Sequence, residues 1–145
     1  MVRVTTLSPA FAVAGQLGKA DFAALAQQGF KSVIANRPDG ESWGQPEAIE
    51  LQTWAADAGL QFRFIPLRMS DALELPAAEA TRAAIAGMPG PVLAFCKSGT
   101  RSAIAWASAE IAAQPVEAVI EALRQADVDI PGLAGELRER AALKN

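Results

Sequence analysis

One short segment holds the residues best suited to nucleophilic chemistry, because it contains the only cysteine in the chain. The segment reads CKSGTRS over residues 96–102 and directly follows the apolar run PVLAF. A cysteine thiolate is a strong nucleophile, and the planar guanidinium of Arg101 can bind two oxygens of a tetrahedral anion. Ser102 can donate its hydroxyl to the thiolate or to a leaving sulfur. We therefore predict that Cys96, Arg101 and Ser102 form a catalytic group that attacks an anionic substrate.

The elements on either side of this segment should position it as an anion site. The apolar run before Cys96 predicts a buried strand, and the alanine-rich stretch from about Arg101 onward predicts a helix. In an open α/β sheet, ligands bind beyond the carboxyl ends of the strands. A loop that leads from a strand into a helix there points free N–H groups at an anion and also stabilises a thiolate. The residues that we expect to bind the substrate are Lys97, Ser98, Gly99 and Thr100.

An inert role for the thiol is the main alternative at this position. A lone cysteine at a strand end is commonly a small buried hydrophobic residue. Here the thiol precedes a glycine-containing loop, an arginine and a helix start, and this combination favours the reactive interpretation. Gly99 permits the loop to curl tightly, because a side chain at that point would crowd the backbone.

Composition narrows the chemistry further. The 145 residues include no His and one Cys, which excludes imidazole-based zinc sites, Ser-His and Cys-His dyads, and an internal disulfide. We expect no metal and no other cofactor. The net charge of −3 and the lack of any basic block argue against nucleic-acid binding. Without an 18-residue apolar run or a signal-peptide core, we expect a cytoplasmic protein that does not bind membranes.

Strand-like and helix-like segments alternate along the chain and predict an α/β fold. Short segments rich in apolar and β-branched residues predict strands at 3–7, 11–15, 30–36, 61–67 and 89–96. Amphipathic or alanine-rich segments predict helices at 19–29, 46–60, 76–88, 98–113, 115–129 and 130–145. This order implies one domain over residues 1–145, with a single mostly parallel sheet of four to five strands flanked by helices.

Three segments resemble a known bacterial family. The segments AGQLGKADFAALAQQGFKSVIANRPDGE, FRFIPLR and PVLAFCKSGTRS are similar to the phosphatase-like domain of beta-lactamase-hydrolase-like proteins. VIANRPDGE and CKSGTRS are the most specific of them, and the resemblance covers roughly residues 10–110. That family is similar in fold to dual-specificity tyrosine phosphatases. The resemblance implies a cysteine-phosphatase-like fold and a hydrolase that acts on a phosphate ester.

Two departures from the phosphatase pattern favour a different reaction. Tyrosine phosphatases have five residues between the cysteine and the arginine, whereas this chain has the four residues 97–100. Four is the spacing of rhodanese-like sulfurtransferases, whose cysteine carries sulfane sulfur. The residue before the nucleophile is Phe95, where phosphatases usually have His. These features imply a sulfane-sulfur donor as the alternative substrate.

An acidic residue in the segment RMSDALELP supports the phosphatase alternative. Asp71 lies 25 residues before Cys96, on the loop from which dual-specificity phosphatases supply a general acid. Phosphoryl transfer needs such a proton donor because an alkoxide leaves poorly at neutral pH, whereas sulfane transfer needs none. A turn or helix cap is an equally good interpretation of Asp71. Glu74 is the substitute acid.

The segment RPDGESWGQP, which follows the strand predicted at 30–36, carries further charged residues. Arg37 either holds a carboxylate or faces the substrate, with the structural role favoured. Asp39 and Glu41 are expected to organise a turn near the site. Trp43 is a possible substrate contact, whereas Trp54 and Trp106 lie on predicted helices and are expected in the core.

Three functions therefore stay open at the level of the sequence. The first is a cysteine-dependent phosphatase-like hydrolase, the second is a rhodanese-like sulfurtransferase that works through a Cys96 persulfide, and the third is an anion-binding module without turnover. The sequence determines neither the natural substrate nor the oligomeric state.

Overall fold

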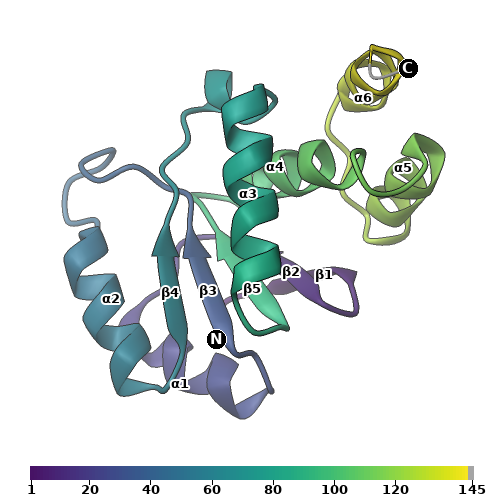
Figure 1. Ribbon diagram of the computed structural model, residues 1–145. Coiled ribbons are helices and arrows are strands. Elements are labelled where there is room, and N and C mark those ends of the chain that lie inside the picture. Colours follow the sequence, from purple (N-terminus) through teal and green to yellow (C-terminus); the bar gives the residue numbers. More distant parts are fainter. Residues whose placement is uncertain (144–145) are drawn as a thin grey trace.

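The computed structural model describes residues 1–143, in which a five-stranded sheet runs through the molecule (Figure 1). The strands lie in the order β1-β2-β5-β3-β4. Only the β1–β2 pair is antiparallel, and the other three pairings are parallel. The strands are β1 Val4–Ser8, β2 Phe11–Ala14, β3 Ser32–Ala35, β4 Gln61–Phe64 and β5 Val92–Phe95. The predicted α/β class and mostly parallel sheet are confirmed.

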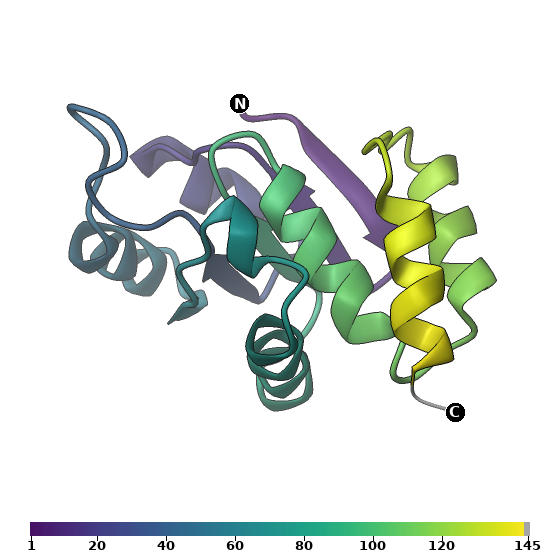
Figure 2. The same cartoon turned by 90° about the horizontal axis from the view of Figure 1, so that it is seen from above.

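Helices cover both faces of the sheet. One face carries α1 and α2, and the other carries α3 and α4, while α5 and α6 pack beyond α4 beside β1 (Figures 1 and 2). A short 3₁₀ turn, η1, precedes α3. The bounds are α1 Lys19–Gln27, α2 Ala48–Asp57, η1 Met69–Asp71, α3 Leu75–Gly87, α4 Thr100–Glu110, α5 Val116–Gln125 and α6 Leu133–Ala142. Each helix begins within a few residues of its predicted start.

The central strands β2, β3 and β5 consist mainly of apolar residues because both of their faces are buried. In β5, Val92 and Ala94 pack with α3 and α4, whereas Leu93 and Phe95 pack with α1 and α2. Full burial of one valine, leucine or phenylalanine side chain stabilises the fold by about 2 kcal/mol. Such burial fixes the register of β5, and the position of Cys96 directly after it follows from that register.

The helix that follows the nucleophile is almost entirely enclosed. Nine of its residues are buried, from Arg101 to Ala109, and most are Ala or Ser. These small side chains let α4 approach the sheet on one side and α3 on another, and Trp106 stacks on Phe11 with ring centroids 6.3 Å apart. The start of α4 is therefore held firmly relative to the end of β5.

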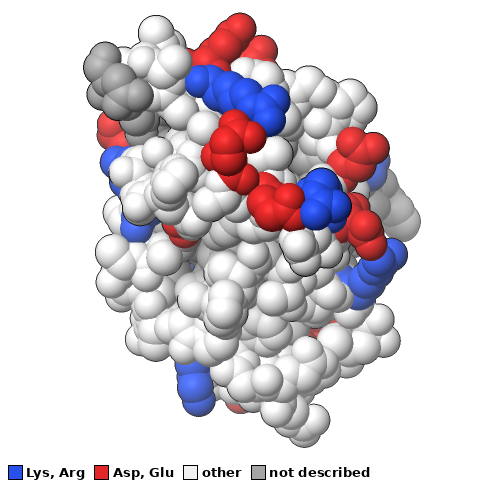
Figure 3. Space-filling model, turned by 90° about the vertical axis from the view of Figure 1, so that its right-hand side faces the viewer, with Lys and Arg blue, Asp and Glu red and all other residues white. Residues whose placement is uncertain are grey.

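The outer helices carry charges of both signs. Seen from the right-hand side of Figure 1, acidic and basic side chains lie next to one another in the upper part of the face, and a broad uncharged surface lies below them (Figure 3). Arg138 on α6 donates to Glu117 on α5 at 2.8 Å, and Arg124 pairs with Glu121 within α5. Within residues 1–143, no helix is both long and apolar enough to cross a membrane.

Candidate active site

The thiol of Cys96 lies at the bottom of the loop between β5 and α4. The residue is buried, and the backbone N–H of Gly99 donates a hydrogen bond to its sulfur at 3.1 Å. Gly99 is the N-cap of α4 and has φ +93°, a left-handed conformation that favours glycine. A Cβ at Gly99 would lie 3.5 Å from the backbone of Ala14, which is an ordinary contact, so glycine is favoured here by the backbone conformation and not by crowding. The loop therefore curls as predicted and aims at least one N–H at the sulfur.

The residues between Cys96 and Arg101 differ in what they offer to a ligand. The side chains of Lys97 and Ser98 are exposed, and the carbonyl of Lys97 accepts a hydrogen bond from the backbone N–H of Gln16 at 3.3 Å. The hydroxyls of Ser98 and Thr100 form a hydrogen bond with each other at 3.1 Å. A Cβ at Gly15 would lie 3.1 Å from the Lys97 carbonyl oxygen, so this second glycine permits the β2–α1 loop to approach. The sequence analysis missed the role of Gly15.

Arg101 is held by partners from two other loops. It is only 8% exposed, and its Nη1 donates to Glu41 Oε2 at 2.7 Å and to the carbonyl of Leu67 at 2.9 Å. Its Nη2 donates to Glu41 Oε1 at 2.9 Å. The hydrogen bond to Glu41 raises the pKa of Arg101 against the effect of burial, and the neighbouring Cys96 adds to that increase. Arg101, in the first turn of the helix that follows Cys96, is therefore fixed in orientation.

Glu41 is the residue that the sequence analysis placed only in a turn. It accepts hydrogen bonds from two arginines, because Arg37 Nε also donates to its Oε1 at 3.0 Å. The hydrogen bond from Arg101 lowers the pKa of Glu41 from 4.5 to about 2; burial opposes this shift and Arg37 adds to it. No local sequence signal could have shown that this carboxylate contacts Arg101, 60 residues away.

Arg37 holds a carboxylate, in agreement with the structural alternative for this residue. Only 7% of it is exposed, and beyond Glu41 it donates to Gln16 Oε1 at 3.0 Å and to Ser42 Oγ at 2.9 Å. These contacts join the β2–α1 loop to the β3–α2 loop. Asp39, in contrast, accepts a hydrogen bond from the backbone N–H of Ala48 at the start of α2 and does not contact Arg101.

The hydroxyl of Ser102 has a different partner from the expected one. It donates to Asn36 Oδ1 at 2.8 Å, and Asn36 Nδ2 donates to the carbonyl of Ile65 at 2.9 Å. The second bond fixes which end of the amide faces Ser102, so the hydroxyl hydrogen points at Asn36 and not at the sulfur. Ser102 thus anchors the start of α4 to the end of β3 in this structure. Asn36, which is buried, was absent from the predicted site.

The predicted acid Asp71 caps its own turn. Its Oδ2 accepts the backbone N–H of Arg68 at 3.0 Å and lies 3.5 Å from the Nε of that arginine. Asp71 and Glu74 line a groove of about 500 Å³ that also includes Leu67, the residue whose carbonyl holds Arg101. Neither carboxylate forms a hydrogen bond with Cys96 or Arg101, so a catalytic role for either stays a prediction.

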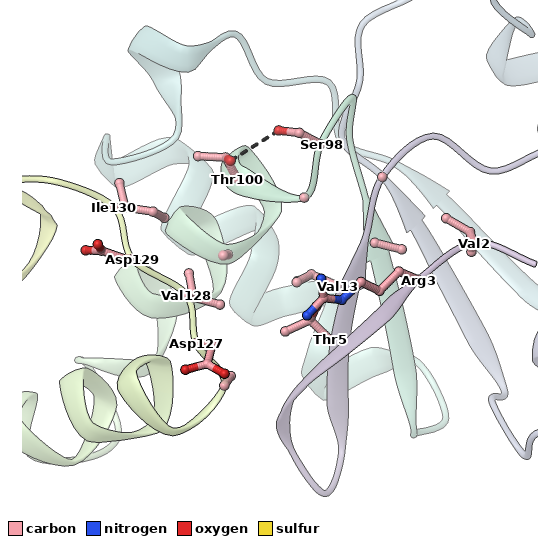
Figure 4. Close-up of a pocket in the computed structure, with 15 residues that line it drawn as sticks. Val2, Arg3, Thr5, Val13, Ser98, Thr100, Asp127, Val128, Asp129 and Ile130 are labelled. Carbon is pink, nitrogen blue, oxygen red and sulfur yellow. Dashed lines mark hydrogen bonds between the residues drawn. The ribbon is translucent and has the colours of Figure 1, made fainter.

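A separate cavity of about 440 Å³ borders the nucleophile loop on the side of β1 (Figure 4). Ser98, Gly99 and Thr100 form part of its wall, whereas Cys96 and Arg101 do not line it. Arg3 and Asp127 line other parts of the same cavity. Three of the expected substrate-binding residues thus border this cavity, and the hydroxyls of Ser98 and Thr100 point toward each other. Across residues 1–143, no three His, Cys, Asp or Glu side chains come together as a metal site.

The three tryptophans fall into two groups. Trp106 is buried and Trp54 packs edge-on against Phe22 with ring centroids 6.2 Å apart, as expected for core residues. Trp43 is fully exposed at the tip of the β3–α2 loop. Gln45 Nε2 donates to the carbonyl of Pro38 at 2.8 Å and closes the base of that loop. Contact between Trp43 and a substrate stays a prediction.

Solved structures share this architecture. A candidate phosphatase from Neisseria meningitidis is 30% identical, has a TM-score of 0.81, and matches over 94% of this chain and 96% of its own. P. aeruginosa TpbA in complex with phosphotyrosine has a TM-score of 0.58 at 16% identity, over 95% of this chain and 82% of its own. At that identity the second match shows the fold alone.

Sequence comparisons identify the family. Residues 3–113 match the model of the beta-lactamase hydrolase-like protein, phosphatase-like domain. A beta-lactamase hydrolase-like protein from Agrobacterium fabrum is 39% identical over 101 residues, covering 70% of this chain and 23% of the relative. One from Xylella fastidiosa is 36% identical over 110 residues, covering 76% and 25%. This chain thus spans about a quarter of the length of these relatives. The chain belongs to the phosphatase-like domain family of beta-lactamase hydrolase-like proteins.

Proposed function

We propose that this domain is a cysteine-dependent phosphatase-like hydrolase that acts on a phosphate ester. The observation that carries the proposal is the arrangement around the thiol. Cys96 accepts the Gly99 N–H at the start of α4, and Arg101, in the first turn of that helix, has its guanidinium fixed by Glu41. A helix start and a fixed guanidinium both stabilise negative charge, on the thiolate and on the oxygens of a bound anion. The phosphotyrosine bound to TpbA, a protein of similar fold, supports a phosphate ester as the substrate class.

The proposed reaction has two steps. The Cys96 thiolate attacks phosphorus, the bond from phosphorus to the leaving oxygen breaks, and a thiophosphate forms while Arg101 and the loop N–H groups bind the non-reacting oxygens. Asp71 gives its proton to the leaving oxygen. Asp71 then takes a proton from water, the water oxygen attacks phosphorus, and the S–P bond breaks to release phosphate and the thiolate. For this role Asp71 must release its cap on Arg68 when substrate binds.

Sulfur transfer is the second candidate, favoured by the four-residue spacing between Cys96 and Arg101 and by the engagement of Asp71 as a cap. In this reaction the thiolate attacks the outer sulfur of thiosulfate, the S–S bond breaks, and sulfite leaves. The persulfide on Cys96 then passes its outer sulfur to a thiol or to cyanide, which restores the thiolate. No step needs a proton donor. An anion-binding module without turnover is the third candidate.

One paired assay separates the three candidates. Wild-type protein, Cys96→Ser and Asp71→Asn are each given p-nitrophenyl phosphate and, separately, thiosulfate with cyanide. The proposed function predicts phosphate release that is lost at least 10³-fold in Cys96→Ser and reduced in Asp71→Asn. Thiocyanate formation that depends on Cys96 but not on Asp71 would instead establish sulfur transfer. If neither substrate is turned over while phosphate or sulfate still binds, the module without turnover is correct.

A further inference from the structure

Arg140 reaches from α6 to the β4–α3 loop, which carries Asp71. Helix α6 lies outside residues 3–113, the part of the chain that matches the family model. The Nη1 of Arg140 donates a hydrogen bond to the carbonyl oxygen of Leu73 at 2.5 Å. Its Nη2 lies 3.7 Å from Glu74 Oε1, and an ion pair of this length at an exposed carboxylate adds little. The main polar contact between α6 and this loop is therefore the hydrogen bond to the Leu73 carbonyl.

The Leu73 carbonyl has no donor in its own segment. It lies just before α3, where a carbonyl ordinarily accepts from an N–H three or four residues further along the chain. Pro76 has no N–H, and the N–H of Ala77 donates to the Glu74 carbonyl at 3.1 Å. No backbone N–H within residues 1–143 donates to the Leu73 carbonyl, so Arg140 supplies its hydrogen bond. A hydrogen bond from a guanidinium is stronger than one between neutral groups, so this contact holds the loop well.

The segment that Arg140 holds is joined directly to the turn of Asp71. The N–H of Glu74 donates to the Asp71 carbonyl at 2.9 Å. Ala72, between them, is fully buried in the apolar cluster that α6 also joins. On the other side of Asp71, the side chains of residues 68–70 are exposed. The turn is therefore anchored at its C-terminal end and exposed at its N-terminal end.

We propose that Arg140 is a positioning residue for Asp71 and acts through the Leu73 carbonyl. This role rests on the proposed function, in which Asp71 leaves its cap on Arg68 and protonates the leaving oxygen. With the chain after Asp71 held by Arg140, that motion is confined to residues 68–71. Without Arg140, the whole turn moves, and the carboxylate spends less time where it can reach the leaving oxygen. Misplacement of a catalytic group by about 1 Å is enough to slow a reaction markedly.

The first test compares two leaving groups in variants of α6. Arg138→Gln is the matched control, because Arg138 lies on the same helix and pairs with Glu117 of α5 without touching the β4–α3 loop. We expect Arg140→Gln to lower kcat about 5-fold for an alkyl phosphate and less than about 2-fold for p-nitrophenyl phosphate, with KM unchanged. Arg138→Gln should leave both kcat values within about 2-fold of wild type. Arg140→Lys keeps an N–H donor and should restore most of the lost rate.

A double variant tests whether Arg140 acts through Asp71. If it does, Arg140→Gln should cause no further loss of kcat in a protein that already carries Asp71→Asn, because the group being positioned is gone. Loss of a contact that only stabilises the fold would instead add to the effect of Asp71→Asn.

A third measurement detects the contact without any turnover. Arg68 is exposed at the start of the turn, so trypsin can cut after it when the loop opens. We expect this cut, followed by mass spectrometry, to form about 5-fold faster in Arg140→Gln than in wild type or Arg138→Gln. The cut after Arg124, an exposed residue of α5, is the internal reference for general loosening of the outer helices.

The outcomes separate this role from the proposed function. An unchanged rate of cleavage after Arg68 in Arg140→Gln overturns the role of Arg140, and so does an equal loss of kcat for both phosphates or an additive loss in the double variant. Wild-type protein that releases no phosphate overturns the proposed function and the role of Arg140 together. Far-ultraviolet circular dichroism and the thermal midpoint establish that each variant is folded. If Arg140→Gln does not fold, Arg140→Lys replaces it, and changes of about 1.5- to 2-fold in the same directions are then expected.

Discussion

Two loops leave adjacent parallel strands at the same edge of the sheet and use their carboxylates in opposite ways. In the β3–α2 loop, Glu41 reaches inward to Arg101. In the β4–α3 loop, Asp71 turns back to the backbone of Arg68, and it is the carbonyl of Leu67 that contacts Arg101. Each loop therefore holds the same guanidinium, one with a side chain and the other with its backbone.

The difference follows from which donors each carboxylate can satisfy. Arg37 and Arg101 are buried cations, and a buried guanidinium without a partner costs several kcal/mol, so the nearest acidic side chain is drawn to them. Asp71 lies at a 3₁₀ turn that offers a free backbone N–H three residues earlier, and a local hydrogen bond satisfies it. The buried cations near each loop thus decide which hydrogen bonds Glu41 and Asp71 form.

The largest effect is expected from a change in Arg101, the residue that both loops hold. Arg101→Lys keeps the charge but offers no planar fork, so neither Glu41 nor an anion can be bound through two parallel hydrogen bonds. We expect kcat/KM to fall about 10³-fold on whichever of the two assay substrates is turned over. Arg68→Lys, a change at an exposed arginine beside Asp71, is the control and should stay within about 2-fold. A loss below 10-fold in Arg101→Lys would mean that neither loop serves catalysis.

A smaller effect is expected from Asp71, whose carboxylate caps its own turn and does not contact Arg101. If Asp71 leaves its cap to act as the general acid, Asp71→Asn should lower kcat about 10²-fold for an alkyl phosphate. The reduction should be smaller for p-nitrophenyl phosphate, because its better leaving group depends less on a proton donor. Asn also caps turns well, so the thermal midpoint should change little. Glu74→Gln is the matched control from the same groove and should not show this dependence on the leaving group. Equal kcat values for Asp71→Asn and wild type on the alkyl ester would show that Asp71 only caps.

The smallest effect concerns stability at acid pH. The pKa of Glu41 is lowered to about 2 from 4.5, so its ion pair stabilises the fold fully above pH 4.5 and this contribution is lost as the pH falls toward 2. Because Glu41 is partly exposed, we expect the contribution to be about 2 kcal/mol. The urea midpoints of wild type and Glu41→Gln should therefore differ at pH 6 and converge by pH 2. A difference that does not change with pH would show that the ion pair adds no stability.

The sequence predicted the parts of the site that are local in the chain. The apolar run of β5, the glycine at position 99 and the helix start at position 100 place the thiol where it was expected, because each depends on neighbouring residues. Sequence reasoning missed Asn36 as the partner of Ser102 and Glu41 as the partner of Arg101. Those pairs depend on how the loops after β3, β4 and β5 pack together at the edge of the sheet. The spacing of residues within one sequence does not predict this packing.

The long sequence separations in the site also have a consequence for folding. Arg101 and Glu41 lie 60 positions apart, and Ser102 and Asn36 lie 66 apart. Contacts of this range require closure of large chain loops, which is slow and unfavourable until the rest of the sheet has formed. Formation of β5 and α4 alone would bring together every residue of the CKSGTRS segment and none of the side chains that hold Arg101. Preference of the thiol for an anionic reagent would therefore mark complete assembly of the sheet during refolding.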